Sequence, residues 1–227
     1  MSSADIRGLF VTGTGTGVGK TVVAAVIANA LRAGGQRVAV FKPAVTGLDA
    51  EEEPDHELLR RAAGSTQSDD QIAPYRFAPP ASPHLAAEQA DTRIEPSELV
   101  RAARAAAAAA DVLVCEGVGG LLVPLSGGYL VRDLAQELSL PLAVAAAPGL
   151  GTINHTLLTL EAARAAGLEI AAVVLTPWPA EPGPVERSNR ETIAALGDIR
   201  VETLESLDLD RPGSWPGLAI GDERPPG

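Results

Sequence analysis

A glycine-rich segment near the start of the chain limits the folds that this sequence can adopt. Residues 13–21 read GTGTGVGKT, follow an apolar run at 9–11 and precede a helical pattern of apolar residues at 22–31. Closely spaced glycines let backbone N–H groups turn towards one anion, and the start of the next helix adds positive dipole character. Lys20 could then reach the β- and γ-phosphates of a nucleoside triphosphate, and the Thr21 hydroxyl could face a magnesium ion. The segment predicts a phosphate-binding loop between a strand and a helix.

This segment departs from the common phosphate-binding pattern by one residue. Five residues separate Gly13 from Gly19, where four are usual. A flexible turn would also be rich in glycine and threonine, but the apolar run before the segment and the helical pattern after it favour the phosphate-binding interpretation. Gly34 and Gly35 are expected to end the helix.

Length and composition predict one domain with an aliphatic core. The 227 residues suffice for one large domain, and nothing in their composition divides them, so 1–227 is expected to form a single unit. Hydrophobic residues make up 46% of the chain and aromatic residues only 3%. The core must therefore consist of Ala, Val, Leu and Ile, as is typical of helices packed on a parallel sheet.

The charge balance and the cysteine content restrict the partners and the compartment. Eighteen basic residues against 29 acidic ones give a net charge of -11, which argues against a general affinity for nucleic acid or for anionic membranes. No apolar run approaches the roughly 20 residues of a membrane span, and residues 1–5 lack a basic region followed by an apolar one, so no signal peptide is expected. The single cysteine, Cys115, cannot form an internal disulfide. A cytoplasmic protein is expected.

Apolar runs and helical patterns alternate along most of the chain. This alternation predicts an α/β fold with a parallel sheet of about seven strands and helices on both faces. Ligands bind beyond the carboxyl ends of the strands in such sheets. The predicted strands are 9–11, 38–41, 112–115, 142–146, 170–175 and 199–203, and the predicted helices are 19–33, 55–63, 95–110, 130–138, 152–166 and 184–196.

Two segments fall outside this alternation. Residues 65–83 are rich in Pro, Ser, Asp and Gln, which predicts a long loop over one end of the sheet. Residues 211–227 are rich in Pro and Gly, and only 218–220 are apolar enough to pack, so a partly ordered, loosely packed tail is expected.

Charged residues follow two of the predicted strands. Lys42 and Pro43 come directly after the second strand, where a second ammonium could face the same phosphates. Glu116 comes at the end of the third strand and is followed by glycines, where a carboxylate could hold magnesium. For Lys42 the alternative is an ordinary surface lysine, but Pro43 fixes the backbone there. For Glu116 the alternative is an ordinary turn, but an unpaired buried carboxylate is costly. Cys115, beside Glu116, is expected to be a small core residue.

Two other segments allow more than one interpretation. Asp55 ends the acidic run 49–55, which by composition is most simply a solvated loop. Residues 149–155 follow a strand and open a helix, so their N–H groups could receive an anion such as a carboxylate, but a plain helix cap explains them equally well.

Taken together, these segments give the chain a resemblance to the dethiobiotin synthetases over almost its entire length. Each motif alone is weak or moderate evidence, whereas the set in this order and spacing is highly specific. The matching segments are 11–21 with its extra loop residue, Lys42-Pro43 with Thr46-Gly47, Ser82-Pro83-His84, residues 116–120 (EGVGG) and residues 151–155 (GTINH).

The resemblance implies a P-loop NTPase fold and an ATP-dependent carboxylation with ring closure. The expected reaction converts 7,8-diaminopelargonate and CO2 to dethiobiotin through a carbamate and a carbamic-phosphoric anhydride, releasing ADP and phosphate. By the same resemblance, Lys20 is the phosphate lysine, Lys42 steadies the carbamate and the transferring phosphoryl group, and Thr16 touches the reacting groups.

The resemblance further implies binding residues. Thr21, Asp55 and Glu116 match magnesium ligands, and Thr46 matches a substrate-contacting hydroxyl. The family forms homodimers, so Gly151, Thr152 and Asn154 are expected to hold the substrate carboxylate of the neighbouring subunit's site. The nucleotide-binding residues implied are Gly17, Val18, Gly19, Lys20, Thr21, Val22, Asp55, Glu116, Gly117, Val118, Gly119, Thr176, Pro177, Glu205 and Leu207.

The sequence departs from the family pattern on the side of the nucleotide base. Some members carry an Asn-Asp pair that reads the adenine edge, whereas Thr176 and Pro177 stand here, and Glu205 replaces a common proline. Threonine and proline offer fewer edge-directed hydrogen bonds. We therefore expect that other triphosphates, such as CTP, can replace ATP.

Two other protein classes share the phosphate-binding loop. Amidotransferase-type synthases need a glutamine-hydrolysing domain with a nucleophilic cysteine, and neither the chain length nor the position of Cys115 suits one. Partition ATPases are nucleotide switches whose loops usually carry an additional early lysine, which Thr14, Gly15 and Thr16 do not supply. The enzymatic interpretation is preferred to both.

Overall fold

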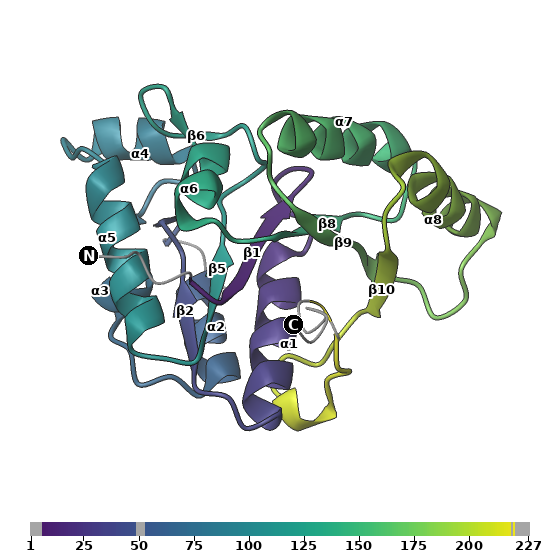
Figure 1. Ribbon diagram of the computed structural model, residues 1–227, viewed down its shortest axis with the longest axis horizontal. Coiled ribbons are helices and arrows are strands. Elements are labelled where there is room, and N and C mark those ends of the chain that lie inside the picture. The colour runs from purple at the N-terminus through teal and green to yellow at the C-terminus, as the bar shows by residue number, and fades with distance from the viewer. Residues whose placement is uncertain (1–5, 49–52, 219, 221–227) are drawn as a thin grey trace.

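The computed structural model describes residues 6–48, 53–218 and 220, and a six-stranded parallel sheet lies at its centre (Figure 1). Its strands are β1 (Gly8–Gly13), β2 (Val38–Phe41), β5 (Val112–Glu116), β8 (Leu142–Ala146), β9 (Ile170–Trp178) and β10 (Val201–Glu205). They follow the order β10-β9-β8-β1-β5-β2. The predicted α/β fold is confirmed, with six strands in this sheet where about seven were expected.

Helices connect the successive strands of the main sheet, as the alternation predicts. Proline stands at the first position of several of them, where its missing N–H costs no hydrogen bond. The helix α1 ends at Ala33, and Gly35 follows it with φ 85°, a conformation that favours glycine. The helices are α1 (Lys20–Ala33), α2 (Asp55–Ala63), α3 (Asp69–Ile72), α4 (Pro83–Gln89), α5 (Pro96–Ala108), α6 (Val131–Leu138), α7 (Thr152–Ala165) and α8 (Pro184–Gly197).

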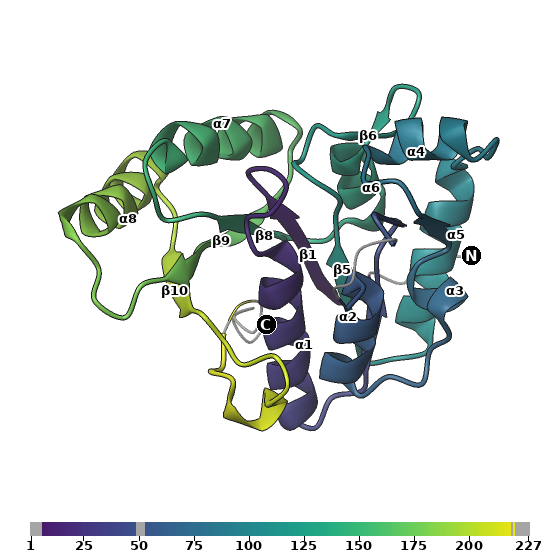
Figure 2. The same ribbon diagram turned by 180° about the vertical axis from the view of Figure 1, so that it is seen from behind.

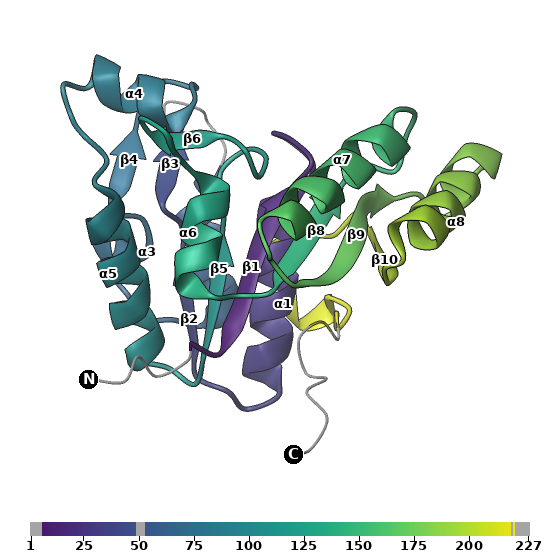
Figure 3. The ribbon, with the colours of Figure 1, turned by 45° about the horizontal axis from the view of Figure 1, so that its top comes forward.

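The two faces of the sheet carry separate aliphatic cores. In β1, Leu9 and Val11 pack with α1 and α2, while Phe10 points to the opposite face and packs with α5 and α6. This alternation follows from the two-residue period of a strand. The helices α1 and α2 lie side by side on their face (Figure 2), and α7 and α8 pair on the other (Figure 3). Helices thus cover both faces of the sheet, as expected.

The segment 65–83, expected to be a long loop, contains regular structure. It includes the short helix α3 and the strand β4 (Tyr75–Phe77), which pairs in parallel with β3 (Ala44–Thr46). A second small sheet pairs β6 (Pro124–Ser126) with β7 (Tyr129–Leu130). The loop prediction was wrong here because a three-residue strand has too short a pattern to be recognised by its period.

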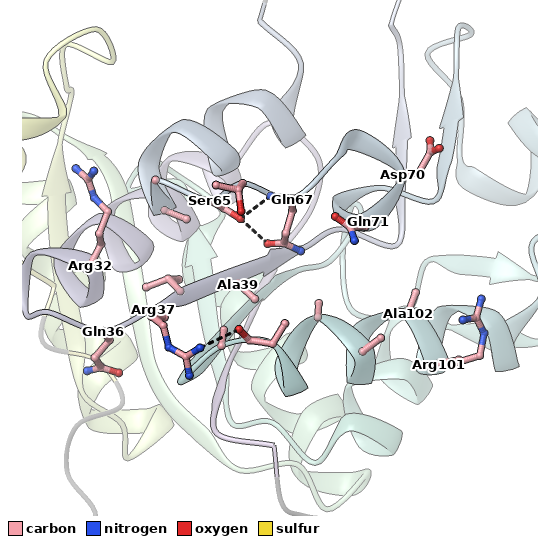
Figure 4. A pocket seen from close by; sticks show the side chains of 18 residues that line it. Arg32, Gln36, Arg37, Ala39, Ser65, Gln67, Asp70, Gln71, Arg101 and Ala102 are labelled. Atoms are coloured by element: carbon pink, nitrogen blue, oxygen red, sulfur yellow. Dashed lines mark hydrogen bonds between the residues drawn. The ribbon is translucent and has the colours of Figure 1, made fainter.

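The strand β2 lies at an edge of the main sheet, and the side chain of Gln67 covers part of that edge (Figure 4). Its amide nitrogen donates to Val40 O at 3.0 Å, and its Oε1 accepts from Val40 N at 2.9 Å. One side-chain amide therefore takes the place of a residue in a further strand. Lys42 N continues along the edge by donating to Ile72 O at 2.8 Å. Such cover prevents an exposed strand from pairing with other chains.

The segment after β10 packs against α1. Leu218 and Ile220 are buried there, as expected, and Trp215 is also buried beside them, which was not predicted. Asn29 Nδ2, on α1, donates to Pro212 O at 3.0 Å. The rest of the predicted tail, 221–227, and residue 219 lie outside the described residues. Nowhere in the described ranges is a helix both long and apolar enough to cross a membrane.

Candidate active site at the carboxyl ends of the strands

The phosphate-binding loop and the two charged strand ends meet at the carboxyl ends of the strands. Register fixes this arrangement, because β5 pairs with both β1 and β2 and aligns Glu116 with Val11 and Cys115 with Phe41. Lys42 and Glu116 consequently leave neighbouring strands at the same level. A cavity of about 910 Å³ opens there. It is lined by Thr16, Gly17, Gly19, Lys20, Thr21, Val22, Lys42, Ala44, Thr46, Glu53, Asp55, Leu58, Pro80, Ala81, Ser82, Pro83, Glu116, Val118, Gly119, Val123 and Leu209.

Four polar side chains form one connected cluster in this cavity. Lys42 Nζ lies 2.6 Å from Glu116 Oε1 and 2.9 Å from Asp55 Oδ2. Thr21 Oγ1 lies 2.9 Å from Asp55 Oδ1 and 3.0 Å from Glu116 Oε1. Asp55 is the first residue of α2, so the fold brings it to the cluster from a distant part of the sequence. The acidic residue that composition could not single out thus faces Thr21, Lys42 and Glu116.

Burial and mutual attraction shift the pKa values of this cluster. Burial alone would lower the pKa of Lys42, but the carboxylates of Glu116 and Asp55 raise it above its ordinary value. Burial would raise the pKa of Asp55, yet Lys42 and the Thr21 hydroxyl hold it below its ordinary value. For Glu116, burial outweighs the attraction of Lys42 and raises the pKa. The cluster is a buried ion pair with one carboxylate on its open side.

The cluster suits a hard divalent cation. A hydroxyl and two carboxylates supply only oxygen ligands, as Mg²⁺ prefers, and Mg²⁺ usually takes one or two carboxylates together with substrate phosphates. Glu116 Oε2 is buried and has no hydrogen-bond partner, so one strong acceptor remains available. Among the described residues, no group of three or more His, Cys, Asp or Glu could hold a metal ion by itself. The residues therefore fit a cation that arrives with phosphates.

The phosphate-binding loop has the backbone that its glycines allow. Gly17 and Gly19 have φ 73° and 86°, in the left-handed region that favours glycine. Lys20 opens α1, and its Nζ donates to Gly15 O at 2.8 Å across the loop. Burial lowers the pKa of Lys20, although Glu116 opposes that change. The loop stands between β1 and α1, where the sequence predicts it.

Comparison with known proteins identifies the family. The model of a family described as an AAA domain matches residues 7–204. An ATP-dependent dethiobiotin synthetase of Anaeromyxobacter dehalogenans strain 2CP-C is 47% identical over 84% of this chain and 86% of its own. A dethiobiotin synthetase of Mycobacterium sp. strain KMS is 43% identical over 89% of this chain and 92% of its own. The chain belongs to the dethiobiotin synthetase family.

Membership of this family confirms the predicted resemblance and the predicted enzyme class, an ATP-dependent ligase. A ParA-family ATPase from Chlorobium tepidum has a similar structure, with a TM-score of 0.53 over 92% of this chain and 88% of its own. At 15% identity, that similarity concerns the fold alone. It confirms the α/β P-loop architecture that the dethiobiotin synthetases share with partition ATPases.

Twelve of the residues proposed from the family pattern line the cavity, and others lie outside its lining. Val18 and Gly117 pack behind the loop, the latter against Phe10 and Val131. Thr176 is buried near the end of β9, where its Cγ2 would lie 2.6 Å from a Cβ at Gly19, so it borders the phosphate-binding loop. The remaining residues outside the lining are Pro177, Glu205, Leu207, Gly151, Thr152 and Asn154.

The segment 149–154 lies at the start of α7, away from this chain's own cavity. Asn189 Nδ2 holds its backbone by donating to Pro148 O at 2.9 Å and to Gly149 O at 3.1 Å. The Thr152 hydroxyl is buried 3.4 Å from the Thr156 hydroxyl. Leu150, by contrast, is 98% exposed. The segment is thus held at its base by hydrogen bonds and exposes an apolar side chain to solvent.

Some cavity residues were missed by sequence reasoning. Leu58 on α2 and Leu209 after β10 form apolar walls, and their sequence surroundings are those of any packed helix or loop. Residues 80–83 close another side. The Ser82-Pro83 pair was part of the family pattern but received no role. Only the family pattern could have signalled this wall, because its local chemistry is that of an ordinary helix start.

A second cavity of about 680 Å³ lies at the opposite, amino end of β2 (Figure 4). Alanines of α5 form one wall, and Arg32, Arg37 and Arg101 lie on its rim. Arg37 is paired with Asp111 at 2.7 Å, and Arg101 is paired with Glu98. This cavity contains neither the glycine loop nor the buried ion pair, so the 910 Å³ cavity is the candidate active site.

Proposed function

We propose that this protein closes the urea ring of dethiobiotin from 7,8-diaminopelargonate, CO2 and a nucleoside triphosphate. The observation that carries the proposal is the position of Lys42, whose Nζ lies within 2.9 Å of two carboxylates in the cavity that also contains Lys20 and Thr21 of the phosphate-binding loop. Family membership supports the same activity. The charges of two lysines suit a reaction in which negative charge builds up on transferring groups.

The proposed chemistry needs three bond-forming steps and no covalent enzyme intermediate. One substrate amine attacks CO2 and loses a proton, which gives a carbamate. A carbamate oxygen then attacks the γ-phosphorus and ADP leaves. Finally the second amine attacks the carbamate carbon, the C–O bond breaks, phosphate leaves and a proton is released. In this scheme the protein mainly orients the reactants and neutralises their charge.

Particular side chains have particular tasks in this scheme. Lys20 binds the β- and γ-phosphates, while Lys42 and the exposed hydroxyl of Thr16 act on the carbamate and the transferring phosphoryl group. The Thr46 hydroxyl contacts the diamine. Thr21, Asp55 and Glu116 would hold Mg²⁺, which supplies positive charge to the phosphate oxygens when bound. The orphaned Glu116 Oε2 supports this assignment.

The nucleotide base would lie beside Thr176 and Pro177, with Glu205 and Leu207 on the neighbouring strand end. Thr176 is buried against Gly19, and its side chain offers one hydroxyl in place of an amide and a carboxylate. We therefore propose weak selection among bases, so that CTP replaces ATP. Initial rates with each triphosphate test this directly, and a strong preference for ATP would contradict it.

A homodimer completes the proposed site. Gly151, Thr152 and Asn154 begin α7 outside this chain's own cavity, and the start of a helix favours an anion. These residues would receive the substrate carboxylate bound in the other subunit. The 98% exposed Leu150 supports a contact surface at this place. Light scattering of the purified protein measures the subunit number, and a monomer at working concentration would contradict the proposal.

The reaction itself is tested by mass spectrometry. Purified protein with the diamine, bicarbonate, Mg²⁺ and ATP should yield dethiobiotin together with ADP, and omission of any component should abolish the product. Lys42→Ala should still bind nucleotide but lose most turnover, whereas Lys20→Ala should also weaken nucleotide binding. Hydrolysis of ATP without dethiobiotin, with CTP and GTP also tried, would mean that the phosphate site is correct and the substrate is wrong.

A further inference from the structure

The chain contains only two lysines, Lys20 and Lys42, among its 18 basic residues, and the other 16 are arginines. Both lysines line the candidate active site. Arginine thus supplies every other basic side chain, while the two positions in this cavity carry a compact ammonium. An ammonium is a point charge on a flexible stem, whereas a guanidinium is planar and takes up more room.

Both ammonium groups are bound by acceptors of the protein itself. Lys20 Nζ donates to the Gly15 carbonyl at 2.8 Å. Lys42 Nζ lies between Glu116 Oε1 and Asp55 Oδ2, at 2.6 Å and 2.9 Å, and the Lys42 side chain is only 3% exposed. Neither lysine therefore extends freely into the cavity.

The close partners of Lys42 are the two carboxylates assigned to the metal, and Gly117 O accepts a longer hydrogen bond from the same ammonium at 3.5 Å. Thr21 Oγ1, the third group of that set, lies 2.9 Å and 3.0 Å from the same two carboxylates. Two of these three side chains thus already hold one cation, the lysine ammonium, and the third is hydrogen-bonded to both of them. A fully buried carboxylate such as Glu116 needs a positive partner, because an isolated buried charge is costly.

The Lys42 ammonium cannot neutralise the two carboxylates and contact a substrate at the same time. While Lys42 is bound to Asp55 and Glu116, its donors are directed at carboxylates and not at a substrate. A divalent cation on these carboxylates would satisfy them with two positive charges and would repel the ammonium at close range. The cavity offers the space into which Lys42 could then move.

We propose that Lys42 is a stand-in cation, which occupies the metal position between Asp55 and Glu116 in the free protein and is expelled towards the substrate when the metal ion binds. Arrival of the metal with its nucleotide thereby delivers the reactive lysine. This inference rests on the proposed function for the metal set and for the task of Lys42. It adds that the Lys42 ammonium exchanges between two positions. Lys42 reaches the substrate only after the metal ion has bound.

The two-lysine composition makes the exchange directly observable. Full-length protein labelled with ¹⁵N at the lysine ammonium nitrogen should give two side-chain signals, and the signal missing from Lys42→Met belongs to Lys42. We expect the Lys42 ammonium protons to exchange slowly with water in the free protein and with a non-hydrolysable ATP analogue alone. Saturating Mg²⁺ with the analogue should speed that exchange at least about tenfold, because the buried acceptors are then occupied. Equal protection with the metal bound would overturn the proposal.

Metal affinity gives a second readout. Mn²⁺ binding, followed by electron paramagnetic resonance in the presence of the same analogue, should be at least about tenfold tighter in Lys42→Met than in the native protein, because the competing cation is gone. Arg101→Met, which removes an equal charge from an exposed position on α5, should leave Mn²⁺ affinity unchanged. If Lys42→Met binds Mn²⁺ no more tightly than Arg101→Met, Lys42 does not compete with the metal.

Neither measurement depends on turnover. Failure to form dethiobiotin, together with release of Lys42 by the metal, would reject the proposed substrate and retain the stand-in cation. Formation of dethiobiotin, with Lys42 equally protected with and without the metal, would retain the proposed substrate and reject the stand-in cation. If Lys42→Met proves too unstable to purify, the signal missing from Lys20→Met belongs to Lys20 and the remaining signal to Lys42, so the exchange measurement on the native protein can still be interpreted.

Discussion

Thr176 lies directly against Gly19, so closely that a Cβ at position 19 would come within 2.6 Å of Thr176 Cγ2. The end of β9 thereby supports the turn that leads into α1. Two constraints meet at Gly19, because its φ of 86° already favours glycine. The shape of the phosphate-binding loop therefore depends on a strand far away in the sequence.

Gly19→Ala should weaken nucleotide binding by at least about tenfold, because a side chain there strains the backbone by about 1–3 kcal/mol and also meets Thr176. Gly15→Ala is the matched control, since a Cβ at Gly15 would meet nothing within 4 Å. Calorimetric titration with a non-hydrolysable triphosphate compares the two. Equal affinities for both variants would show that the loop tolerates a side chain at either position.

Glu116→Gln should destabilise the protein by about 3 kcal/mol, because removing one charge of a buried pair leaves the other poorly compensated. Glu53→Gln provides the comparison. Glu53 also lines the cavity, but its ion pair with Arg61 is partly exposed, so its loss should cost less than about 1 kcal/mol. Urea unfolding measures both values. Similar losses would indicate that the Lys42–Glu116 pair contributes no more than a surface pair.

Cys115 should react with thiol reagents only in unfolded protein. The side chain is fully buried in β5, and burial, followed by the neighbouring charge of Glu116, raises the pKa of its thiol well above the ordinary value. A colorimetric disulfide reagent should therefore detect no thiol in native protein and one thiol per chain in concentrated urea. Rapid reaction of native protein would mean that β5 opens locally.

Gln67→Ala should destabilise the protein by about 1–2 kcal/mol, because two backbone groups of Val40 lose their partners at the edge of the sheet. Gln89→Ala, at the exposed end of α4, should change stability by less than about 0.5 kcal/mol. Thermal unfolding gives both values, and light scattering after mild heating reports aggregation. Were the two variants equally stable, the edge of β2 would not need Gln67.

The contribution of the Arg37–Asp111 ion pair to the stability of the folded protein should disappear in acid. The side-chain hydrogen bond from Arg37 lowers the pKa of Asp111 in the folded protein. A folded-state pKa below the unfolded one adds stability at higher pH, and this stability is lost as the pH falls through the folded value. Asp111→Asn should thus be less stable than the native protein at pH 7 and equally stable in strong acid. If the stability difference between Asp111→Asn and the native protein does not change with pH, this ion pair is not the source of that difference.

Much of the fold could be read from the sequence because the main strands are continuous apolar runs. The runs at 38–41 and 142–146 match β2 and β8 to the residue, and the predicted helix 55–63 matches α2. Strands that continue beyond their apolar run into a polar residue were predicted too short. β5, for example, was predicted as 112–115 and extends to Glu116. The small sheets were missed because their strands are two or three residues long.

The candidate site was predictable where a strand end carries an unusual residue. Lys42 and Glu116 each follow an apolar run, and a charge at the end of a buried strand is informative. Asp55 had no such local signal, because an acidic residue among acidic neighbours is ordinary. Its approach to Thr21 depends on how α2 packs against α1, which residue order alone does not reveal. Leu58 and Leu209 were missed for the same reason.

The order of strands in the sheet has a consequence for synthesis of the chain on the ribosome. β5 lies between β1 and β2, yet it is translated after both, so these two apolar strands have no partner in the main sheet until β5 emerges. Pairing of segments so distant in sequence is slow, and exposed strand edges promote aggregation. The nascent chain is therefore prone to aggregation until β5 inserts between β1 and β2. The same insertion brings Glu116 into contact with Lys42 and Thr21.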